Sequence, residues 1–407
     1  MKCRFCAAEL ADVFVDLVTA PLSNSYLTVE QLDGPETYYP LKLFVCRCCW
    51  LVQVPAHQVC ERIFAADYAY FSSYSSTWLE HARRYVEAAV HRLGLTTGSF
   101  VVEVASNDGY LLQYVAGRGI RCVGIEPTAS TARAARAKGI DTIEAFFGRG
   151  FAEQLVAERG RADLLLGNNV YAHVPDLTDF TAGLKIALAP GGTLTLEFPH
   201  LMRLVGQSQF DTIYHEHYSY FSFATAERVL SAHGLRVWDV EELPTHGGSL
   251  RLWVLHDDDA RQALPVVAEL RSREKAAGML TPGYYAGFQP CADRVKNDLL
   301  AFLLQARKEG KRLAAYGAAA KGSTLLNYAG VKPDLVPYVV DASPHKQGRF
   351  LPGSRIPIVA EEKLQADRPD YVLILPWNLR EEIETQLAYV RRWGARFVTA
   401  VPRMQIQ

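Results

Sequence analysis

Short apolar runs recur through the middle of the chain, and small or polar residues follow each of them. The runs lie at 99–104, 121–125, 143–147, 162–167 and 188–198. Continuous apolar runs of this length are typical of strands that are buried on both faces of a parallel sheet. We therefore expect a doubly wound α/β domain, in which ligands bind beyond the carboxyl ends of the strands.

Apolar residues at helical spacing predict a helix just before the first of these strands. One face of this helix carries Trp78, Ala82, Tyr85, Val86, Ala89 and Val90. Ser75, Ser76 or Thr77 would cap its first turn. After the central domain we expect a helix at 223–235, a strand pair at 236–240 and 249–255, and charged helices to about residue 310.

A second α/β unit is predicted at the carboxy-terminal end, with strands at 312–316, 336–340 and 371–375. At 407 residues the chain is too long for one ordinary core. We expect three domains, at 1–66, 67–258 and 259–407.

The net charge of −1 argues against a nucleic-acid partner, because such proteins carry a clearly basic surface. We find no apolar run of ~20 residues, as a membrane span requires, and no charged-then-apolar leader. We therefore expect a cytoplasmic protein with no membrane partner.

Five of the eight cysteines crowd the first fifty positions. Cys3 and Cys6 form one Cys-x-x-Cys knuckle, and Cys46 and Cys49 form another. Two such knuckles complete a closed tetrahedral thiolate site, which predicts a structural zinc ion. Cys48 is an alternative fourth ligand, and free thiols are the other possibility. Only Cys60, Cys122 and Cys291 lie elsewhere. The residues between the knuckles have too few apolar side chains for a core of their own, so we expect a bound metal ion to stabilise them.

The segment Tyr214–Tyr220 reads Tyr-His-Glu-His-Tyr-Ser-Tyr, with one acid, two imidazoles and three phenols in seven residues. This density of proton-transfer groups is typical of a catalytic segment, because His titrates near neutral pH and Glu can orient it. An aromatic-rich surface loop and a metal site with His and Glu ligands are the alternatives. Asn168, Asn169 and His173 follow the fourth strand and are expected to line the same site.

The turn after the first strand, Ala105–Gly109, lacks the G-x-G-x-x-G pattern that a dinucleotide requires. A dinucleotide needs glycines there so that the backbone can come close to its pyrophosphate. S-adenosylmethionine has no phosphate, so the turn resembles that of a class I methyltransferase more than that of a dehydrogenase. An acid at the end of the second strand, Glu126, is placed to bind ribose hydroxyls. The residues expected to bind this cofactor are Glu103, Ser106, Asn107, Asp108, Gly109, Glu126, Phe147, Asn168 and Asn169.

The four-cysteine knuckle, Glu103–Gly109, Asn168–His173 and Tyr214–Tyr220 together resemble the nucleotide-sugar C-methyltransferases of deoxysugar biosynthesis. The resemblance covers essentially the whole chain. It implies a three-domain enzyme that methylates C-3 of a nucleotide-linked 4-keto-6-deoxyhexose with S-adenosylmethionine. Carried over by position, it implies an active site of Tyr74, His173, Tyr214, Glu216 and His217, with His217 as the base and Glu216 orienting it.

The carboxy-terminal unit offers polar residues at three strand ends. A diphosphate cradle is plausible where small residues and a Lys open a helix, and the resemblance implies that this unit anchors the nucleotide sugar; a scaffolding lobe is the alternative. The expected substrate contacts are Lys321, Gly322, Ser323, Asp341, Ser343, Trp377 and Asn378. The turn Thr245–Arg251 either faces the cleft or is an ordinary hairpin.

The expected reaction is C-methylation of an enolate carbon. O- or N-methylation of a nucleotide sugar, methylation at C-5, and a zinc-containing binding or epimerising protein are the alternatives. The sequence leaves open which nucleotide the sugar carries and whether C-3 bears an amine or a hydroxyl. It is also silent on oligomeric state, although a monomer would suffice because the chain contains both binding lobes.

Overall fold

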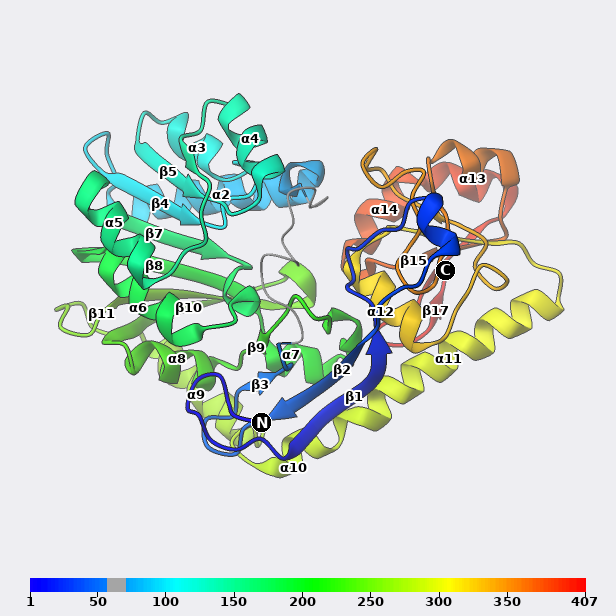
Figure 1. Ribbon diagram of the computed structural model, residues 1–407, viewed down its shortest axis with the longest axis horizontal. Helices are drawn as coiled ribbons and strands as arrows, with labels where there is room; N and C mark the ends of the chain where they lie inside the picture. The colour runs from blue at the N-terminus through cyan, green and yellow to red at the C-terminus, as the bar shows by residue number, and fades with distance from the viewer. Residues whose placement is uncertain (57–70) are drawn as a thin grey trace.

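The computed structural model describes residues 1–56 and 71–407. Cys60 and the expected domain boundary at residue 66 lie outside the described residues. The central and carboxy-terminal sheets form two lobes, and the hairpin of β1 (Asp12–Ala20) and β2 (Tyr39–Val45) lies at the base between them (Figure 1). Each lobe can therefore present strand ends toward the other.

The central sheet has seven strands in the order β6-β5-β4-β7-β8-β11-β10. They are β4 (Phe100–Val104), β5 (Arg121–Ile125), β6 (Thr142–Ile143), β7 (Ala162–Asn168), β8 (Leu188–Pro199), β10 (Leu235–Leu243) and β11 (Ser249–His256). The first five run parallel, whereas β11 is antiparallel to both of its neighbours. The chain leaves β4 in one direction for β5 and β6, and returns on its other side for β7. This reversal confirms the expected doubly wound fold and creates a crevice at the strand ends.

The helices of this lobe are α2 (Ser76–Leu93), α3 (Leu112–Ala116), α4 (Ala129–Ala137), α5 (Arg149–Arg159), α6 (Leu177–Ala187), α7 (Leu201–Gly206) and α8 (Phe223–Ser231). Of the three possible caps for α2, Ser75 is the residue whose hydroxyl accepts from the backbone N–H of Trp78. The same helix ends at Gly94 in the left-handed conformation, with φ 62°. The helix expected at 223–235 is shorter, because the chain already turns toward β10 after Ser231.

The amino-terminal sheet runs in the order β1-β2-β3-β9. Its last two strands are short: β3 is Val52–Gln53, and β9 is Ser219–Tyr220 from the catalytic segment predicted above. Phe14 on β1 stacks on Phe288 of α11 (Phe288–Lys308), with ring centroids 4.6 Å apart. The amino-terminal segment thus shares its core with distant parts of the chain, as its low apolar content requires.

The four Sγ atoms of Cys3, Cys6, Cys46 and Cys49 all lie within 4.8 Å of one another. Cys3–Cys49 and Cys6–Cys46 are each 3.5 Å apart, close to the edge of a thiolate tetrahedron with Zn–S bonds of about 2.3 Å. Cys48 is exposed and does not belong to this group. The structure therefore selects Cys49 over Cys48 as the fourth ligand.

The carboxy-terminal sheet has six strands in the order β14-β13-β12-β15-β16-β17. They are β12 (Leu313–Tyr316), β13 (Val339–Val340), β14 (Ile358–Val359), β15 (Tyr371–Ile374), β16 (Arg396–Thr399) and β17 (Gln405–Ile406). All except β17 pair in parallel, which confirms a second α/β unit. Its helices are α12 (Ala320–Tyr328), α13 (Glu362–Asp367) and α14 (Arg380–Gln386), and α9 (Pro265–Ala276), α10 (Pro282–Ala286) and α11 lead into it.

Two long-range contacts attach the amino-terminal segment to this lobe. Leu27 pairs with Phe350 in an isolated antiparallel bridge. The Arg355 guanidinium donates to the carbonyls of Leu32 and Gly34, at 2.6 and 3.1 Å. Short 3-10 helices complete the chain at Glu30–Asp33, Ser72–Tyr74, Tyr171–His173, Phe210–Thr212, Thr245–Gly247, Trp377–Leu379 and Ala388–Trp393. Within the described ranges, no helix is long and apolar enough to cross a bilayer.

A pair of cysteine substitutions tests the metal assignment. Cys49→Ser removes one of four thiolates, so zinc content should fall at least ~10-fold and the midpoint of thermal unfolding should drop. Cys48→Ser is the matched control, because Cys48 is exposed and outside the group. Metal analysis of the purified variants and a thermal melt measure both effects. Loss of zinc from the Cys48 variant instead would contradict the assignment.

Candidate active site

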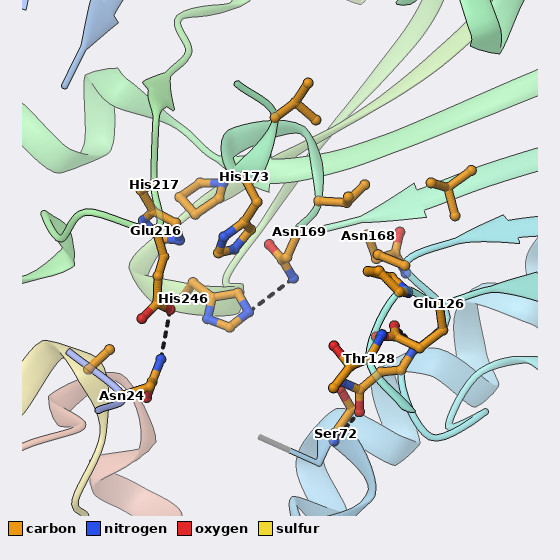
Figure 2. A pocket seen from close by; sticks show the side chains of 18 of the residues that line it. Asn24, Ser72, Glu126, Thr128, Asn168, Asn169, His173, Glu216, His217 and His246 are labelled. Carbon is orange, nitrogen blue, oxygen red and sulfur yellow. Dashed lines mark hydrogen bonds between the residues drawn. The ribbon is translucent and has the colours of Figure 1, made fainter. Parts of the chain in front are cut away.

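A cavity of about 380 Å³ lies between the lobes and receives residues from all three parts of the chain. The central lobe supplies the ends of β4, β5 and β7, the carboxy-terminal lobe supplies the start of α12, and Asn24 comes from the amino-terminal segment. Figure 2 shows two groups of side chains facing each other, with Glu126, Thr128 and Asn168 on one side and Glu216, His217 and His173 on the other. The first group lies at the edge of the central sheet where the cofactor was expected.

The turn after β4 explains why its sequence departs from a glycine-rich pattern. Ala105, Asn107 and Gly109 all have positive φ, at 59°, 50° and 73°. A Cβ at Gly109 would lie 3.1 Å from Ile140 and 3.3 Å from Ala135, so close packing adds to the conformational need for glycine there. Asn tolerates the left-handed region well, which makes Asn107 a suitable substitute for glycine.

Glu126 and Asn168 present polar atoms to the cofactor side of the cavity. The Glu126 carboxylate accepts from the backbone N–H groups of Asn107 and Thr128, each at 2.9 Å. Burial raises its pKa above the ordinary value. Both amide atoms of Asn168 are buried without a hydrogen-bond partner among the described residues. A ligand with hydroxyl and amino groups would satisfy them, so this side fits S-adenosylmethionine.

Four of the predicted cofactor residues lie in β4 or in the turn after it but do not line the cavity among the described residues. Glu103, Ser106, Asp108 and Gly109 are not among the described residues that line the cavity. Glu103 is buried beside Tyr110, and burial raises its pKa well above the ordinary value, with Glu126 and Asp108 adding to the effect. Asp108 pairs with Lys138 at 3.0 Å. These residues shape the turn, whereas Asn107, Glu126, Phe147, Asn168 and Asn169 line the cavity.

His217 is held in one orientation by two hydrogen bonds. Its Nδ1 donates to the Thr212 carbonyl at 2.9 Å, and its Nε2 lies 2.9 Å from the Tyr214 hydroxyl. Nδ1 therefore carries the proton, and Nε2 keeps the lone pair that a base uses. Burial is the main cause that lowers the pKa of His217 well below its ordinary value, and the nearby His173 adds to it. The imidazole is neutral at neutral pH.

Glu216 has a different role from the one expected. Its carboxylate accepts from the Asn24 side chain of the amino-terminal segment at 2.7 Å. The Thr212 carbonyl and the Tyr214 hydroxyl orient His217, and this corrects the expectation that Glu216 does so. His173 lies edge-on to His217, with centroids 4.6 Å apart. Burial lowers the pKa of His173 to about 4, so it is neutral as well.

Tyr74 lies away from this group. It is 57% exposed, contacts the rings of Phe71 and His345, and is not among the described lining residues. The 3-10 helix Ser72–Tyr74 contributes Ser72 to the cavity, and the start of α2 contributes Trp78. The resemblance, carried over by position, placed Tyr74 in the active site, whereas this structure leaves its side chain largely exposed.

Lys321 is the cation at the carboxy-terminal side of the cavity, together with Lys346. Its Nζ donates to Asn378 at 2.8 Å and lies 4.7 Å above the Trp377 ring. Burial lowers the pKa of Lys321 to about 8, against the opposing charge of Asp211. Trp377 itself donates from Nε1 to Asp211 at 2.7 Å, which ties the two lobes together beside the cavity.

The other predicted substrate residues support this wall from behind. Gly322, Ser323, Asp341, Ser343 and Trp377 are not among the lining residues that the structure describes. Gly322 allows α12 to approach Leu375, because a Cβ there would lie 2.7 Å from that side chain. Asp341 accepts from the backbone N–H of Ala318 at 2.8 Å and holds the loop before α12. Lys321 and Asn378 are the two predicted residues that reach the cavity.

Sequence reasoning did not assign several of the lining residues to the site, and it left the turn that carries His246 open. Asn24 pairs with Glu216 across 192 positions, and no local pattern marks it. Trp78 was assigned to a packing face, and Lys346 follows an expected strand end without a motif. His246 belongs to the turn that was left open, and it lines the cavity. Its neighbours Gly247 and Gly248 are the sequence feature that points to a tight turn there.

Comparison with known proteins gives the family. Three family models match: a zinc binding domain at residues 3–64, a methyltransferase domain at 78–240 and a C-methyltransferase C-terminal domain at 244–402. The C-methyltransferase NovU of Streptomyces niveus is 35% identical over 405 residues, which is 100% of this chain and 96% of NovU.

Solved structures give more distant likenesses. The magnesium protoporphyrin IX methyltransferase of Synechocystis PCC 6803 with bound S-adenosylmethionine is 14% identical with TM-score 0.37, over 50% of this chain and 100% of that one. A DhpI complex with S-adenosylhomocysteine is 20% identical with TM-score 0.36, over 50% and 100%. These two likenesses are too remote to inform the site.

The relationship to NovU extends from the zinc knuckle to the last strand, and the three family models follow one another in the same order. The chain therefore belongs to the C-methyltransferase family, as an S-adenosylmethionine-dependent enzyme with an amino-terminal zinc-binding domain.

Proposed function

We propose that this enzyme methylates C-3 of a nucleotide-linked 4-keto-6-deoxyhexose, after removing the proton on that carbon. The observation that carries the proposal is the neutral, buried His217, whose Nε2 keeps its lone pair in the cavity that also receives Glu126 and Asn168. A base for carbon deprotonation must be unprotonated at the working pH and shielded from water, and this imidazole is both. NovU is itself named a C-methyltransferase.

In this mechanism the ketone acidifies the neighbouring C–H, and His217 takes the proton at Nε2. The Nδ1–H bond to the Thr212 carbonyl then stabilises the imidazolium that forms. The Tyr214 hydroxyl, 2.9 Å from Nε2 before substrate binds, must give up that contact for the proton to reach the nitrogen.

When bound, S-adenosylmethionine supplies an electrophilic methyl group to the enolate carbon. Glu126 would hold the ribose hydroxyls, and the unpartnered amide of Asn168 would hold polar groups of the same ligand. Asn107 and Phe147 complete this wall, with Phe147 packed edge-on to Phe180 at 5.3 Å. Positioning two reactants on opposite walls of one cavity is the main source of acceleration that the residues here supply.

The nucleotide diphosphate of the substrate would lie along the carboxy-terminal wall. Lys321 and Lys346 provide positive charge there, and Asn378 orients the Lys321 ammonium group. Because one chain supplies the base, the cofactor wall and these cations, the proposed unit of function is a monomer.

The deciding experiment is a mass-spectrometric assay with S-adenosylmethionine and a panel of dTDP-, GDP- and CDP-linked 4-keto-6-deoxysugars, each paired with its 4-hydroxy counterpart. We expect a gain of one methyl group on a keto sugar and none on the hydroxy partner, because only the ketone acidifies C–H. Methylation of both partners would point to O- or N-transfer and contradict the proposal. Fragmentation of the product distinguishes C-3 from C-5.

Substitution of the base gives a second prediction. His217→Gln should lower kcat about 10²- to 10⁴-fold, the usual contribution of general-base catalysis. The wild-type enzyme should stay active as pH falls through ~6.5, the ordinary His value. The reason is that a base with a lowered pKa becomes protonated only at lower pH. His215→Gln is the control, since His215 is not among the described lining residues. Equal turnover in the two variants would contradict the assignment of His217.

A third prediction concerns the nucleotide wall. Lys321→Met should raise KM for the nucleotide sugar about 10- to 100-fold, because this is the loss of affinity expected when one charged hydrogen bond to phosphate is removed. In the wild-type enzyme KM should also rise above pH 8, because the pKa of Lys321 is about 8 and the free amine no longer attracts phosphate. Binding of S-adenosylmethionine, measured by calorimetry, should not change. A variant with unchanged KM would remove Lys321 from the substrate site.

A further inference from the structure

His246 lines the cavity but has no part in the mechanism above. It lies in the turn between β10 and β11, at the centre of the 3-10 helix Thr245–Gly247. Figure 2 shows it between the group of Glu216 and His173 and the side chain of Asn169. His246 therefore lies near both the proposed base and Asn169, in the part of the cavity where the substrate would react.

The two ring nitrogens of His246 differ: Nε2 accepts a hydrogen bond from Asn169, and Nδ1 can still donate one. The Asn169 amide nitrogen lies 3.2 Å from Nε2 and donates to it, which leaves the proton on Nδ1. Within the described part of the chain, Nδ1 has no hydrogen-bond partner, and it is not among the buried atoms that lack one. Nδ1–H is thus a donor open to the cavity. Burial lowers the pKa of His246 to about 4, so the donor is a neutral imidazole.

The turn that carries His246 is fixed on several sides. His246 has φ 55°, a left-handed conformation that a non-glycine residue adopts only under constraint. The Gly247 carbonyl accepts from Gln209 at 2.8 Å, and a Cβ at Gly247 would lie 2.4 Å from the Trp377 ring. The Trp78 ring meets His246 edge-on, with centroids 5.2 Å apart. A strained residue held so firmly inside a cavity is typical of a functional position.

Glu197 at the end of β8 anchors both neighbours of His246. Its backbone carbonyl accepts from the Asn169 N–H at 2.7 Å, and its carboxylate accepts from the Thr245 hydroxyl at 3.0 Å. The carboxylate is fully buried with His81, at 2.9 Å, and Arg251, at 2.6 Å. Burial opposes its ionisation, but His81 and Arg251 outweigh burial and lower the pKa of Glu197 to about 2. One fixed carboxylate therefore sets the position of the Asn169–His246 pair.

We propose that His246 is a catalytic residue whose Nδ1–H donates a hydrogen bond to the ketone oxygen of the substrate, and that Glu197 is its positioning residue. The inference rests on the function proposed above. When His217 takes the proton from carbon, the C–H electron pair becomes the enolate C=C bond, and negative charge moves to the ketone oxygen. The Nδ1–H bond strengthens as that charge develops, and no proton leaves His246. A neutral donor already in place needs no reorganisation during this step.

The other side chains that could donate a hydrogen bond to the ketone oxygen are less well placed. Tyr74 is outside the cavity lining that the structure describes. The Tyr214 hydroxyl is 2.9 Å from His217 Nε2, and His173 is packed edge-on to His217. Both contact the base directly, whereas the ring of His246 is bonded to Asn169, another lining residue (Figure 2). The oxygen sits on the carbon next to the one that is deprotonated and methylated, so a donor that lies near the base without contacting it matches this position.

The test compares two variants of the same shape. His246→Asn keeps an N–H donor near the Nδ1 position, whereas His246→Asp offers only an acceptor, and both residues tolerate a positive φ. The probe is the panel sugar that wild-type enzyme methylates. Two rates are measured: solvent deuterium entering the carbon beside the ketone with S-adenosylhomocysteine bound, and methylation with S-adenosylmethionine. We expect the Asp variant to lose at least ~10²-fold in both rates, as for loss of an oxyanion donor, with little change in KM. The Asn variant should recover most of this loss.

Each result decides the matter. Equal rates for the Asn and Asp variants, or a change in KM with kcat preserved, would overturn the role of His246 while leaving the proposed function intact. A wild-type enzyme that exchanges no deuterium and methylates no keto sugar would overturn the proposed function, and this inference with it. Thr245→Val tests the positioning role: it removes the hydroxyl that binds Glu197. It should lower kcat without changing the affinity for S-adenosylhomocysteine. Unchanged turnover in that variant would remove Glu197 from the proposal.

Discussion

The pairing of β9 with β3 is the constraint on which the active site depends. Gln53 and Val52 on β3 pair with Ser219 and Tyr220, which directly follow the residues around His217. The zinc knuckle lies at the other end of the same connection, because Gln53 also donates to Cys3 Sγ at 3.2 Å. The metal site takes no part in the reaction, but it helps to hold β3. The pairing of β3 with β9 in turn fixes the position of the predicted catalytic segment. A one-residue slip of β9 would turn every side chain in this segment to the opposite face.

The cavity is lined by three neutral imidazoles and by the side chains of Lys321 and Lys346. His173, His217 and His246 all have lowered pKa values, and in each case burial is the main cause. The unfolded chain binds protons at these positions at higher pH than the folded chain does. Folding stability therefore falls as pH drops below the ordinary His range, because protonation favours the unfolded state. The same lowered pKa values keep the three imidazoles uncharged at neutral pH.

Local sequence patterns were sufficient for the parts of the fold that depend on near neighbours. Two Cys-x-x-Cys spacings located the metal group, and continuous apolar runs located the strands of both α/β units. The acid at the end of β5 was placed correctly on the cavity wall, because a parallel strand always delivers its end to the same edge. The last glycine of the β4 turn likewise has a local steric reason.

Contacts between distant segments could not be predicted in this way. Asn24 meets Glu216, and Trp377 meets Asp211, only because three sheets meet at one place. The orientation of His217 was missed for a related reason. The backbone carbonyl of Thr212 fixes it, and every residue has a backbone carbonyl, so the sequence does not indicate which one binds the imidazole. Tyr74 shows the limit of reasoning from position, since a residue beside a helix start can face solvent as easily as a ligand.

The attachment of the amino-terminal segment to the carboxy-terminal lobe has a consequence for exchanging parts between relatives. Leu27 pairs with Phe350, Arg355 binds two carbonyls between residues 32 and 34, and Asn24 reaches Glu216 from the same segment. A chimaera cut once in the chain, after the central sheet, would separate Leu27 from Phe350 and Arg355 from its two carbonyls, whereas Asn24 and Glu216 would stay together. The carboxy-terminal lobe and the loop between β1 and β2 therefore have to be exchanged as one unit, although they are far apart in the sequence.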